Sequence, residues 1–190
     1  MNLIILFSRR PTLGQVKRRL ARDIGDKAAL EVHQWLFRRT LEVIAQSGIK
    51  STLYLSAQPN EEYDYDFKLQ EGKDLGERMA KAFQHEIDGD NRVCLIGSDC
   101  LDLSPEDLLL ACEKLKKADL VLGPANDGGY YLIGLKQFYP ELFKGIKWSS
   151  PEVFAETLVV ASKLSLKTVL LEKRTDVDKI SDLPANWKAF

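Results

Sequence analysis

The chain has 190 residues, enough for one domain with a substantial hydrophobic core. Its 27 Lys and Arg residues are balanced by 28 Asp and Glu residues, which disfavours a nucleic-acid-binding protein because such proteins carry a basic excess. No apolar run reaches the roughly 20 residues needed to span a bilayer. Three cysteines without disulfide or zinc-site spacing fit a reduced protein, so we expect a single cytoplasmic domain over residues 1–190.

The first predicted strand is the apolar run from Leu3 to Phe7, and its unbroken character is typical of a central parallel strand covered on both faces. The loop that follows carries five cations, namely Arg9, Arg10, Lys17, Arg18 and Arg19. Such a loop lies over the carboxyl edge of an α/β sheet, where cationic side chains and backbone N–H groups match phosphate oxygens. The pattern leaves two interpretations open, a phosphate-binding loop and a solvated basic turn.

Helical periodicity and strand-like runs then alternate. Apolar residues at three- and four-residue spacing predict a helix over Asp26 to Gly48, and we expect His33, which lies on its apolar stripe, to be a hydrogen-bonded core residue. Two short runs follow as predicted strands, 51–55 and 67–69, with a polar surface loop expected between them over residues 58–66. The next helix starts near Asp74, which can cap it. Its positive end and Arg78 either face a bound phosphate or base, or belong to an ordinary capped helix.

Two further apolar runs, Val93 to Ile96 and Leu120 to Leu122, flank a stretch with helical periodicity, whose start is predicted at residues 104–107 by a cap hydroxyl, a proline and two acids. This succession is typical of the βαβ unit of a mostly parallel sheet. Asp99 and Asp127 follow the points where the two runs stop. Because ligands of such sheets bind outside the carboxyl ends of the strands, we expect both carboxylates at one ligand-binding rim.

The turn that contains Asp127 continues with Gly128 and Gly129, which let the backbone approach a ligand closely or adopt a positive φ. Beyond this turn the pattern predicts a strand over Tyr130 to Leu135, a helix after Pro151 and a last strand over Val169 to Leu171. The sequence thus predicts an α/β domain without an internal repeat.

Five acidic residues follow predicted strands: Asp99, Asp102, Asp127, Asp176 and Asp178. Carboxylate oxygens suit Mg²⁺ or Mn²⁺, and Mg²⁺ commonly takes one or two carboxylates together with substrate phosphates and water. A cation there would bridge the phosphates of a nucleotide. Taken singly, each residue is also a common turn or cap residue; several of them on one edge, opposite a cation-rich loop, favour a nucleotide site.

Several motifs resemble those of the bacterial DUF2064 family, and the resemblance runs from about Leu3 to Leu183. The motifs are GQVKRRL (14–20), EGKDLGERM (71–79), LIGSDCLDLSPEDL (95–108), LGPANDGGYYLIGL (122–135), KWSSPEVFAETL (147–158) and TDVDKISDL (175–183). The family is associated with glycosyl or nucleotidyl transfer on a nucleotide-diphospho-sugar transferase fold of the GT-A type. The resemblance therefore implies a three-layer α/β/α sandwich with a mixed, mostly parallel sheet.

The resemblance also implies roles for matching residues. In the family pattern G-x-V-K-T-R-L, Arg18 stands where threonine is usual, and in G-S-D-C-P-D-L, Leu101 replaces proline. The expected metal ligands are Asp99 and Asp178, holding Mg²⁺ or Mn²⁺. The expected catalytic residues are Lys17, Asp99 and Asp127, the last through contact with the acceptor or metal rather than as a base. The expected substrate-binding residues are Gly14, Lys17, Arg19, Asp74, Arg78, Ser98, Asn126, Gly128, Gly129 and Tyr130.

These observations lead to one hypothesis with two enzymatic forms, a metal-dependent transferase that uses a nucleoside triphosphate or a nucleotide sugar. The cations near the expected triphosphate position favour nucleotidyl transfer, whereas the family association favours glycosyl transfer. The substitutions at Arg18 and Leu101 keep a third hypothesis open, a non-catalytic nucleotide-binding or sensing module. The base, the acceptor and the oligomeric state are not specified by the sequence.

Overall fold

A computed structural model describes residues 1–58, 66–89, 91–185 and 187 of the chain. The strands are β1 (Asn2–Ser8), β2 (Ser51–Leu55), β3 (Phe67–Leu69), β4 (Arg92–Ile96), β5 (Leu120–Pro124), β6 (Tyr130–Leu135) and β7 (Thr168–Leu170). The helices are α1 (Arg18–Ile24), α2 (Asp26–Ser47), α3 (Leu75–Glu86), α4 (Pro105–Lys114) and α5 (Val153–Lys163), with the 3-10 turns η1 (Pro140–Phe143) and η2 (Ile180–Asp182). The strands and helices expected from the sequence are therefore present within a few residues of their predicted bounds.

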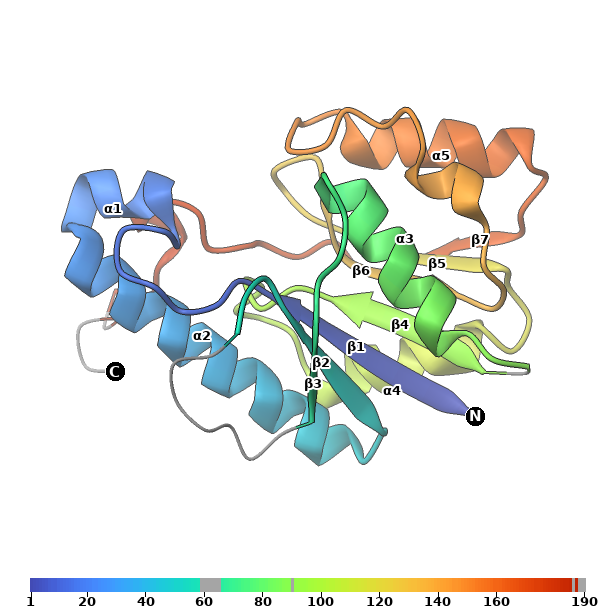
Figure 1. Cartoon of the computed structure of the whole chain (residues 1–190), viewed down its shortest axis with the longest axis horizontal. Helices are drawn as coiled ribbons and strands as arrows, with labels where there is room; N and C mark the ends of the chain where they lie inside the picture. Colours follow the sequence, from blue (N-terminus) through green and yellow to red (C-terminus); the bar gives the residue numbers. More distant parts are fainter. Residues whose placement is uncertain (59–65, 90, 186, 188–190) are drawn as a thin grey trace.

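The strands form one sheet in the order β3-β2-β1-β4-β6-β5-β7 (Figure 1). Strand β6 runs antiparallel to both of its neighbours, and the other pairings are parallel. The predicted β4–α4–β5 crossover joins two parallel strands, but the hairpin β5–β6 folds back so that β6 lies between them. The predicted mixed, mostly parallel sheet is confirmed.

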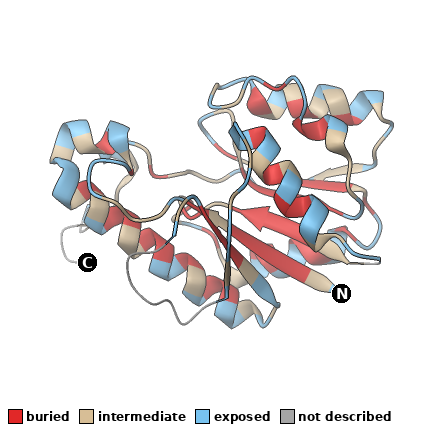
Figure 2. Cartoon of the chain, in the orientation of Figure 1, coloured by how far each residue is buried: buried red, intermediate tan, exposed pale blue. Residues whose placement is uncertain are grey.

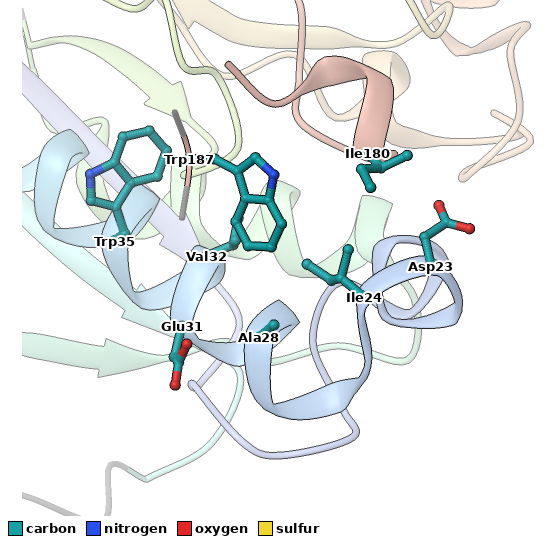
Figure 3. Close-up of a pocket in the computed structure, with 8 residues that line it drawn as sticks. All are labelled: Asp23, Ile24, Ala28, Glu31, Val32, Trp35, Ile180 and Trp187. Atoms are coloured by element: carbon teal, nitrogen blue, oxygen red, sulfur yellow. The ribbon is translucent and has the colours of Figure 1, made fainter. Parts of the chain in front are cut away.

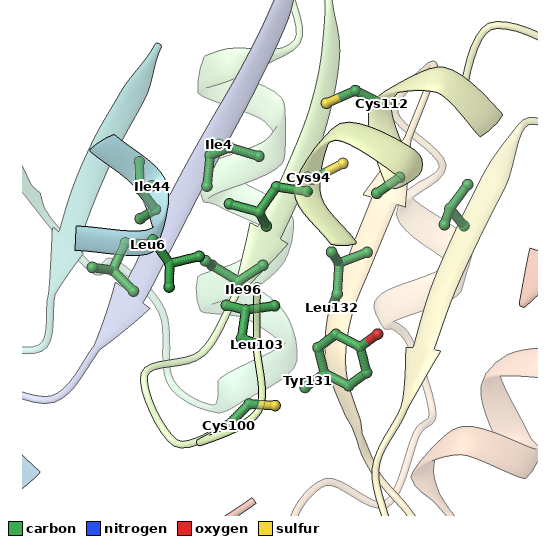
Figure 4. Close-up of a cluster of buried hydrophobic side chains, with 14 of the residues drawn as sticks. Ile4, Leu6, Ile44, Cys94, Ile96, Cys100, Leu103, Cys112, Tyr131 and Leu132 are labelled. Carbon is green, nitrogen blue, oxygen red and sulfur yellow. The ribbon is translucent and has the colours of Figure 1, made fainter. Parts of the chain in front are cut away.

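Two apolar layers cover the sheet, which confirms the three-layer α/β/α sandwich. On one face, α2 and α4 pack against β1, β4 and β6 through side chains that include Ile44 of α2 and Cys112 of α4 (Figure 4). On the other face, α3, η1 and α5 contribute a second cluster that includes Phe83. Figure 2 shows buried residues filling β1 and β4, as expected for central strands covered on both sides.

Helix boundaries follow local chemistry. Asp74 accepts a hydrogen bond from the backbone N–H of Glu77 at 2.8 Å and so caps α3, as predicted. Ser104 and Asp107 form a reciprocal capping box at the start of α4, with Pro105 at its first position. Both helices start just beyond the carboxyl end of the sheet, so their caps help to fix the loops of that rim.

His33 is buried in α2 and donates a hydrogen bond from Nε2 to the carbonyl oxygen of Arg9 at 3.1 Å. This confirms the expected hydrogen-bonded core histidine. Burial lowers the pKa of its imidazole because the charged form loses solvation. A neutral His33 thus fixes the backbone at the start of the cationic loop. The predicted polar loop after β2 falls mostly on residues 59–65, which lie outside the described residues.

Candidate active site

The candidate site lies at the carboxyl ends of β1, β4 and β5, where a segment from the end of the chain crosses two loops. Residues 174–178 return after β7 towards α1 (Figure 1). Arg174 bridges in parallel to Ala125 after β5, and Asp176 bridges in antiparallel fashion to Cys100 after β4. The N–H of Val177 also donates to the carbonyl oxygen of Asp99 at 2.9 Å. Backbone pairing thus brings three acid-bearing segments together.

Lys17 connects the cationic loop to this segment. Its Nζ lies 2.7 Å from Asp99 Oδ1 and donates to the carbonyl oxygen of Val177 at 2.6 Å. The Lys17 side chain is only 3% exposed, whereas the Asp99 side chain is 44% exposed. Lys17 also adopts a left-handed backbone conformation, with φ 47°, as the residue that precedes α1. That conformation costs about 1 to 2 kcal/mol for a residue with a Cβ, so the buried ammonium contacts must offset it.

The ionisation of Asp99 is set by opposing effects. Burial acts to raise the pKa of its carboxyl, but the Lys17 ammonium, through its charge and its hydrogen bond, and the nearby His33 and Arg9 together hold the pKa below the ordinary value. Asp99 is therefore a carboxylate at neutral pH, and its second oxygen has no protein partner in the described part of the chain.

Four aspartates form an acidic cluster at this rim: Asp99, Asp127, Asp176 and Asp178. Asp176 has the most unfavourable environment of the four. Its Oδ1 is buried and has no hydrogen-bond partner among the described residues. Burial, followed by the negative charges of Asp99 and Asp127, raises the pKa of its carboxyl to about 7. Lys17 opposes this rise, and Asp178 adds to it. Asp176 thus faces the other carboxylates without a cation of its own.

Asp178, the expected second metal ligand, has a partner already. Its Oδ2 accepts a hydrogen bond from Arg19 at 2.9 Å, and this ion pair is solvent-accessible, with Arg19 62% exposed. Its backbone N–H donates to Asp182 in η2 at 3.0 Å. Asp99 and Asp178 therefore lie in the same region of the rim, as predicted, while Asp178 is held by the cationic loop. Asp176 was among the acids noted in the sequence but not among the expected ligands.

The carboxylates at this rim fit a divalent cation that takes part of its coordination from the phosphate oxygens of a substrate. Among residues 1–58, 66–89, 91–185 and 187, no three His, Cys, Asp or Glu side chains converge on a point where they could hold a metal ion. Two carboxylates do meet, and one of them carries a buried oxygen without a partner. Mg²⁺ commonly accepts one or two carboxylates and completes its shell with phosphate and water oxygens.

The predicted acceptor turn lies next to this cluster. Asp127 is exposed, and its Oδ1 accepts a hydrogen bond from the N–H of Gly129 at 2.9 Å. Asn126 donates from Nδ2 to Thr175 at 2.6 Å, which ties the turn to the crossing segment. At Gly128, with φ 90°, an added Cβ would lie 2.1 Å from the carbonyl oxygen of Pro151. Glycine is required there by packing against the start of the α5 region.

Tyr130 and Ser98 are less accessible than their predicted roles suggested. The Tyr130 hydroxyl is buried and has no hydrogen-bond partner among the described residues, and its ring packs with the apolar cluster under α3 and α5. The Ser98 hydroxyl is buried and shares a hydrogen bond with Ser8 at 2.9 Å, which ties the ends of β4 and β1 together. Both side chains therefore pack beneath the rim and stabilise it.

The residues expected around α3 form a separate part of the rim. Asp74 is engaged as the helix cap, and Arg78 donates from Nε to the carbonyl oxygen of Gly72 at 3.0 Å. The loop before α3 reaches the end of β1, since Gln70 donates from Nε2 to the carbonyl oxygen of Ser8 at 2.9 Å. Within the described chain, no hydrogen bond or ion pair joins Arg78 to the acidic cluster. The remaining predicted residue, Gly14, is exposed with φ 73° in the cationic loop.

One supporting interaction was not anticipated from the sequence. The guanidinium NH2 of Arg174 donates to both carboxylate oxygens of Asp107, at 2.9 and 3.1 Å, and both side chains are mostly buried. Because Asp107 also belongs to the capping box of α4, this pair anchors the crossing segment to a helix. The capping pattern of Asp107 was visible in the sequence, but its partner lies 67 residues away.

A cavity of about 600 Å³ lies between α1, α2 and η2, beside the cluster rather than in it (Figure 3). Its lining residues are Asp23, Ile24, Ala28, Glu31, Val32, Trp35, Ile180 and Trp187. The walls are mainly apolar, and both charged residues in the lining are acidic. A polyphosphate would be repelled there, so the cavity is distinct from the expected phosphate position.

Comparison with known proteins places the chain in a family. The family model described as "uncharacterized protein conserved in bacteria (DUF2064)" matches residues 40–150, and the chain belongs to this family. A candidate nucleotide-diphospho-sugar transferase from Desulfovibrio desulfuricans G20 is 31% identical, with a TM-score of 0.85 over 94% of this chain and 82% of that one. No curated protein matches the sequence.

More distant structures share the fold. The inositol-1-phosphate CTP transferase of T. maritima has a TM-score of 0.63 at 12% identity, over 98% of this chain and 93% of that one. A CMP:2-keto-3-deoxy-manno-octonic acid synthetase, solved with CTP, has a TM-score of 0.59 at 10% identity, over 100% of this chain and 98% of that one. The chain thus has the fold of nucleotide-diphospho-sugar transferases and nucleotidyltransferases. No helix in the described ranges has the length and apolar character needed to cross a membrane.

Proposed function

We propose that the protein is a nucleotidyltransferase that transfers a nucleoside monophosphate from a nucleoside triphosphate to a phosphorylated acceptor. The observation that carries this proposal is the meeting of the cationic loop with Asp99, Asp176 and Asp178 at the carboxyl rim of the sheet. Phosphoryl-group chemistry requires little from a protein beyond positioning and charge neutralisation. Cations and carboxylates on one rim supply both.

In this reaction an acceptor phosphate oxygen forms a bond to the α-phosphorus of the nucleotide. The bond from that phosphorus to its bridging oxygen breaks, and pyrophosphate leaves with both bonding electrons. Lys17 and Arg19 would neutralise the negative charge of the triphosphate as it shifts towards the leaving group. The turn at residues 126–129 lies beside the acids and would face the acceptor.

A divalent cation has a defined place in the proposal. Asp99 and a second carboxylate of the cluster would hold Mg²⁺ or Mn²⁺, which when bound would stabilise charge on the phosphate oxygens. Asp99 suits this role because its carboxyl remains ionised and partly exposed. The cationic loop would meanwhile hold the phosphates that the ion does not contact.

Glycosyl transfer from a nucleotide sugar is the second candidate, supported by the name of the 31% identical structure. The two reactions differ in the group that leaves. Nucleotidyl transfer releases pyrophosphate from a triphosphate, whereas glycosyl transfer releases a nucleoside diphosphate or monophosphate from a nucleotide sugar. The released group therefore distinguishes the two enzymes independently of the acceptor.

The test begins with melting temperatures measured with each nucleoside triphosphate and each common nucleotide sugar, with and without Mg²⁺ or Mn²⁺. A ligand at about 100 times its dissociation constant adds roughly 2.7 kcal/mol, which raises the melting temperature of a chain of this size by about 5 to 11 °C. Nucleotidyl transfer predicts a metal-dependent shift with a triphosphate that is lost in Asp99→Asn. The control is Asp23→Asn, which changes an exposed carboxylate of α1 in the separate cavity.

Turnover then decides between the remaining outcomes. Pyrophosphate release from the stabilising triphosphate, in the presence of sugar phosphates or other phosphorylated acceptors, supports the proposal. Preference for a nucleotide sugar would replace it with glycosyl transfer. Binding with no release of pyrophosphate or nucleotide over hours would point to a non-catalytic nucleotide-binding module.

A further inference from the structure

We infer that Asp176, rather than Asp178, is the second carboxylate that faces the divalent cation, and that the cation takes the place now held by the Lys17 ammonium. The inference rests on the proposed function, because it concerns the cation that would accompany the nucleotide. It differs from what the sequence motif implies, since the motif assigns the second ligand to Asp178.

The two acids differ in their partners. Asp178 has its Oδ2 bound by Arg19 at 2.9 Å and its backbone held by Asp182. Asp176 has a buried Oδ1 without a partner in the described chain. A buried carboxylate oxygen without a partner is unfavourable, and a bound cation would satisfy it. The motif D-V-D does not show which of its two aspartates forms an ion pair with another side chain.

The backbone places Asp176 next to Asp99. The antiparallel bridge joins Asp176 to Cys100, and the N–H of Val177 bonds to the carbonyl oxygen of Asp99 at 2.9 Å. Asp99 and Asp176 are thus neighbours across a short ladder, and the charge of Asp99 acts directly on the Asp176 carboxyl. The side chain of Val177 is buried and packs with α1 and α2, which fixes the direction of the acids on either side of it.

Lys17 is the counter-charge of this pair in the structure. Its Nζ lies 2.7 Å from Asp99 Oδ1 and binds the carbonyl oxygen of Val177, the residue directly after Asp176. A single ammonium cannot satisfy both carboxylates, because Asp176 Oδ1 is left without a partner. A divalent cation carries twice the charge and accepts oxygen ligands from both sides. Lys17, once displaced, would be free to bind the phosphates that arrive with the ion.

The inference predicts a specific order of Mn²⁺ affinities, measured with Mn²⁺ alone by electron paramagnetic resonance of the free ion. Asp176→Asn should weaken binding by about tenfold or more, since even outer partners of metal ligands contribute 10- to 100-fold. Asp178→Asn should change it by less than about threefold. Lys17→Met should strengthen it, because removing the ammonium removes a competitor. Circular dichroism of each variant, with Lys17→Gln as a second variant at that position, verifies the fold.

Two outcomes would overturn the inference. One is loss of Mn²⁺ binding in Asp178→Asn with retention in Asp176→Asn. The other is absence of Mn²⁺ binding by folded Lys17→Met at millimolar metal. Failure of the proposed function is distinguishable: the predicted order of Mn²⁺ affinities without any nucleotide binding would leave this site standing and remove the nucleotidyltransferase. Turnover that depends on Asp178 but not on Asp176 would support the nucleotidyltransferase and remove the proposed role of Asp176 in cation binding.

Discussion

The carboxyl rim of the sheet has two parts that are built in opposite ways. The charged part, formed by the cationic loop, Asp99 and the crossing segment 174–178, brings like charges together and leaves a buried oxygen of Asp176 without a partner. The packed part, around the starts of α3 and α5, contains glycines pressed against other atoms. An added Cβ at Gly76 would lie 2.1 Å from Nε1 of Trp148, and one at Gly128 would lie 2.1 Å from the carbonyl oxygen of Pro151.

The difference indicates which part serves ligand chemistry and which serves position. Sites that bind charged ligands commonly contain interactions that are unfavourable without the ligand, and the charged part has this property. The packed part is close to its densest arrangement, so added atoms should destabilise it. Removing one of the like charges in the charged part should therefore stabilise the fold, whereas adding atoms in the packed part should destabilise it.

The largest loss is expected where the charged part is anchored. Arg174→Met removes the cation that binds both oxygens of Asp107 and leaves a mostly buried carboxylate without it. Breaking a buried pair in this way costs about 3 to 5 kcal/mol, measurable by urea denaturation. The matched control is Lys116→Met, which removes a pair with Glu113 whose side chains are both about half exposed or more and should cost no more than about 1 kcal/mol. Equal losses would mean that the Arg174 pair is not an anchor.

A gain in stability is expected within the charged part itself. The pKa of Asp176 is raised to about 7, against about 3.9 for an unfolded aspartate. Between about pH 4 and pH 7 the folded chain therefore holds a proton that the unfolded chain has released, and stability declines as the pH rises through this window. Asp176→Asn removes the decline, so at about pH 8 the variant should be more stable by up to about 4 kcal/mol, at roughly 1.4 kcal/mol per pKa unit.

The measurement is the difference in unfolding free energy between Asp176→Asn and the parent chain at about pH 4.5 and about pH 8. That difference should widen as the pH rises, because the other titrating groups are common to both proteins. If the two pH profiles run parallel, Asp176 has an ordinary pKa and the charged part is not under electrostatic strain.

The packed part should respond in the opposite direction. Gly76→Ala places a Cβ against the indole of Trp148 and the carbonyl oxygen of Phe143. In an open helix position the change would add up to about 1 kcal/mol of stability, but here overpacking should cost about 1 to 3 kcal/mol. A double-mutant cycle with Trp148→Leu checks the cause, because the two changes should be less damaging together than the sum of their separate effects.

The smallest effect is expected at the exposed pair between Arg19 and Asp178. Arg19→Met should change the unfolding free energy by no more than about 1 kcal/mol, since Arg19 is 62% exposed. The same change should weaken binding of the stabilising nucleotide, with an effect that diminishes at high salt. A large loss of stability with unchanged nucleotide affinity would give Arg19 a structural role and narrow the charged part to Lys17 and the acids.

Much of the fold followed from local patterns. The unbroken apolar runs at 3–7 and 93–96 predicted central strands, and the helix stripe over 26–48 was confirmed. Residues 104–107 predicted the start of α4 through their capping pattern. The position of β6 between β4 and β5 could not be read from periodicity, because an apolar run looks the same in a parallel and an antiparallel strand.

The sequence predicted which edge of the sheet carries the site, but not which side chains contact one another there. That Asp99, Asp127 and the acids after β7 would share an edge followed from the position of strand ends. Three ion pairs join residues that are 67 to 159 positions apart in the chain: Lys17 with Asp99, Arg19 with Asp178, and Arg174 with Asp107. Such distances are set by tertiary structure, so the distinction between Asp176 and Asp178 required coordinates.

The crossing segment has a consequence for the order in which the protein matures during synthesis. Translation releases β1, its cationic loop and Asp99 early, whereas residues 174–178 emerge after every strand of the sheet. A ribosome-bound chain that has exposed β7 can complete its sheet while still lacking the backbone ladder beside Asp99 and the carbonyl that receives the Lys17 ammonium. Ligand affinity should therefore appear only once residues 174–178 have emerged, later than the sheet itself.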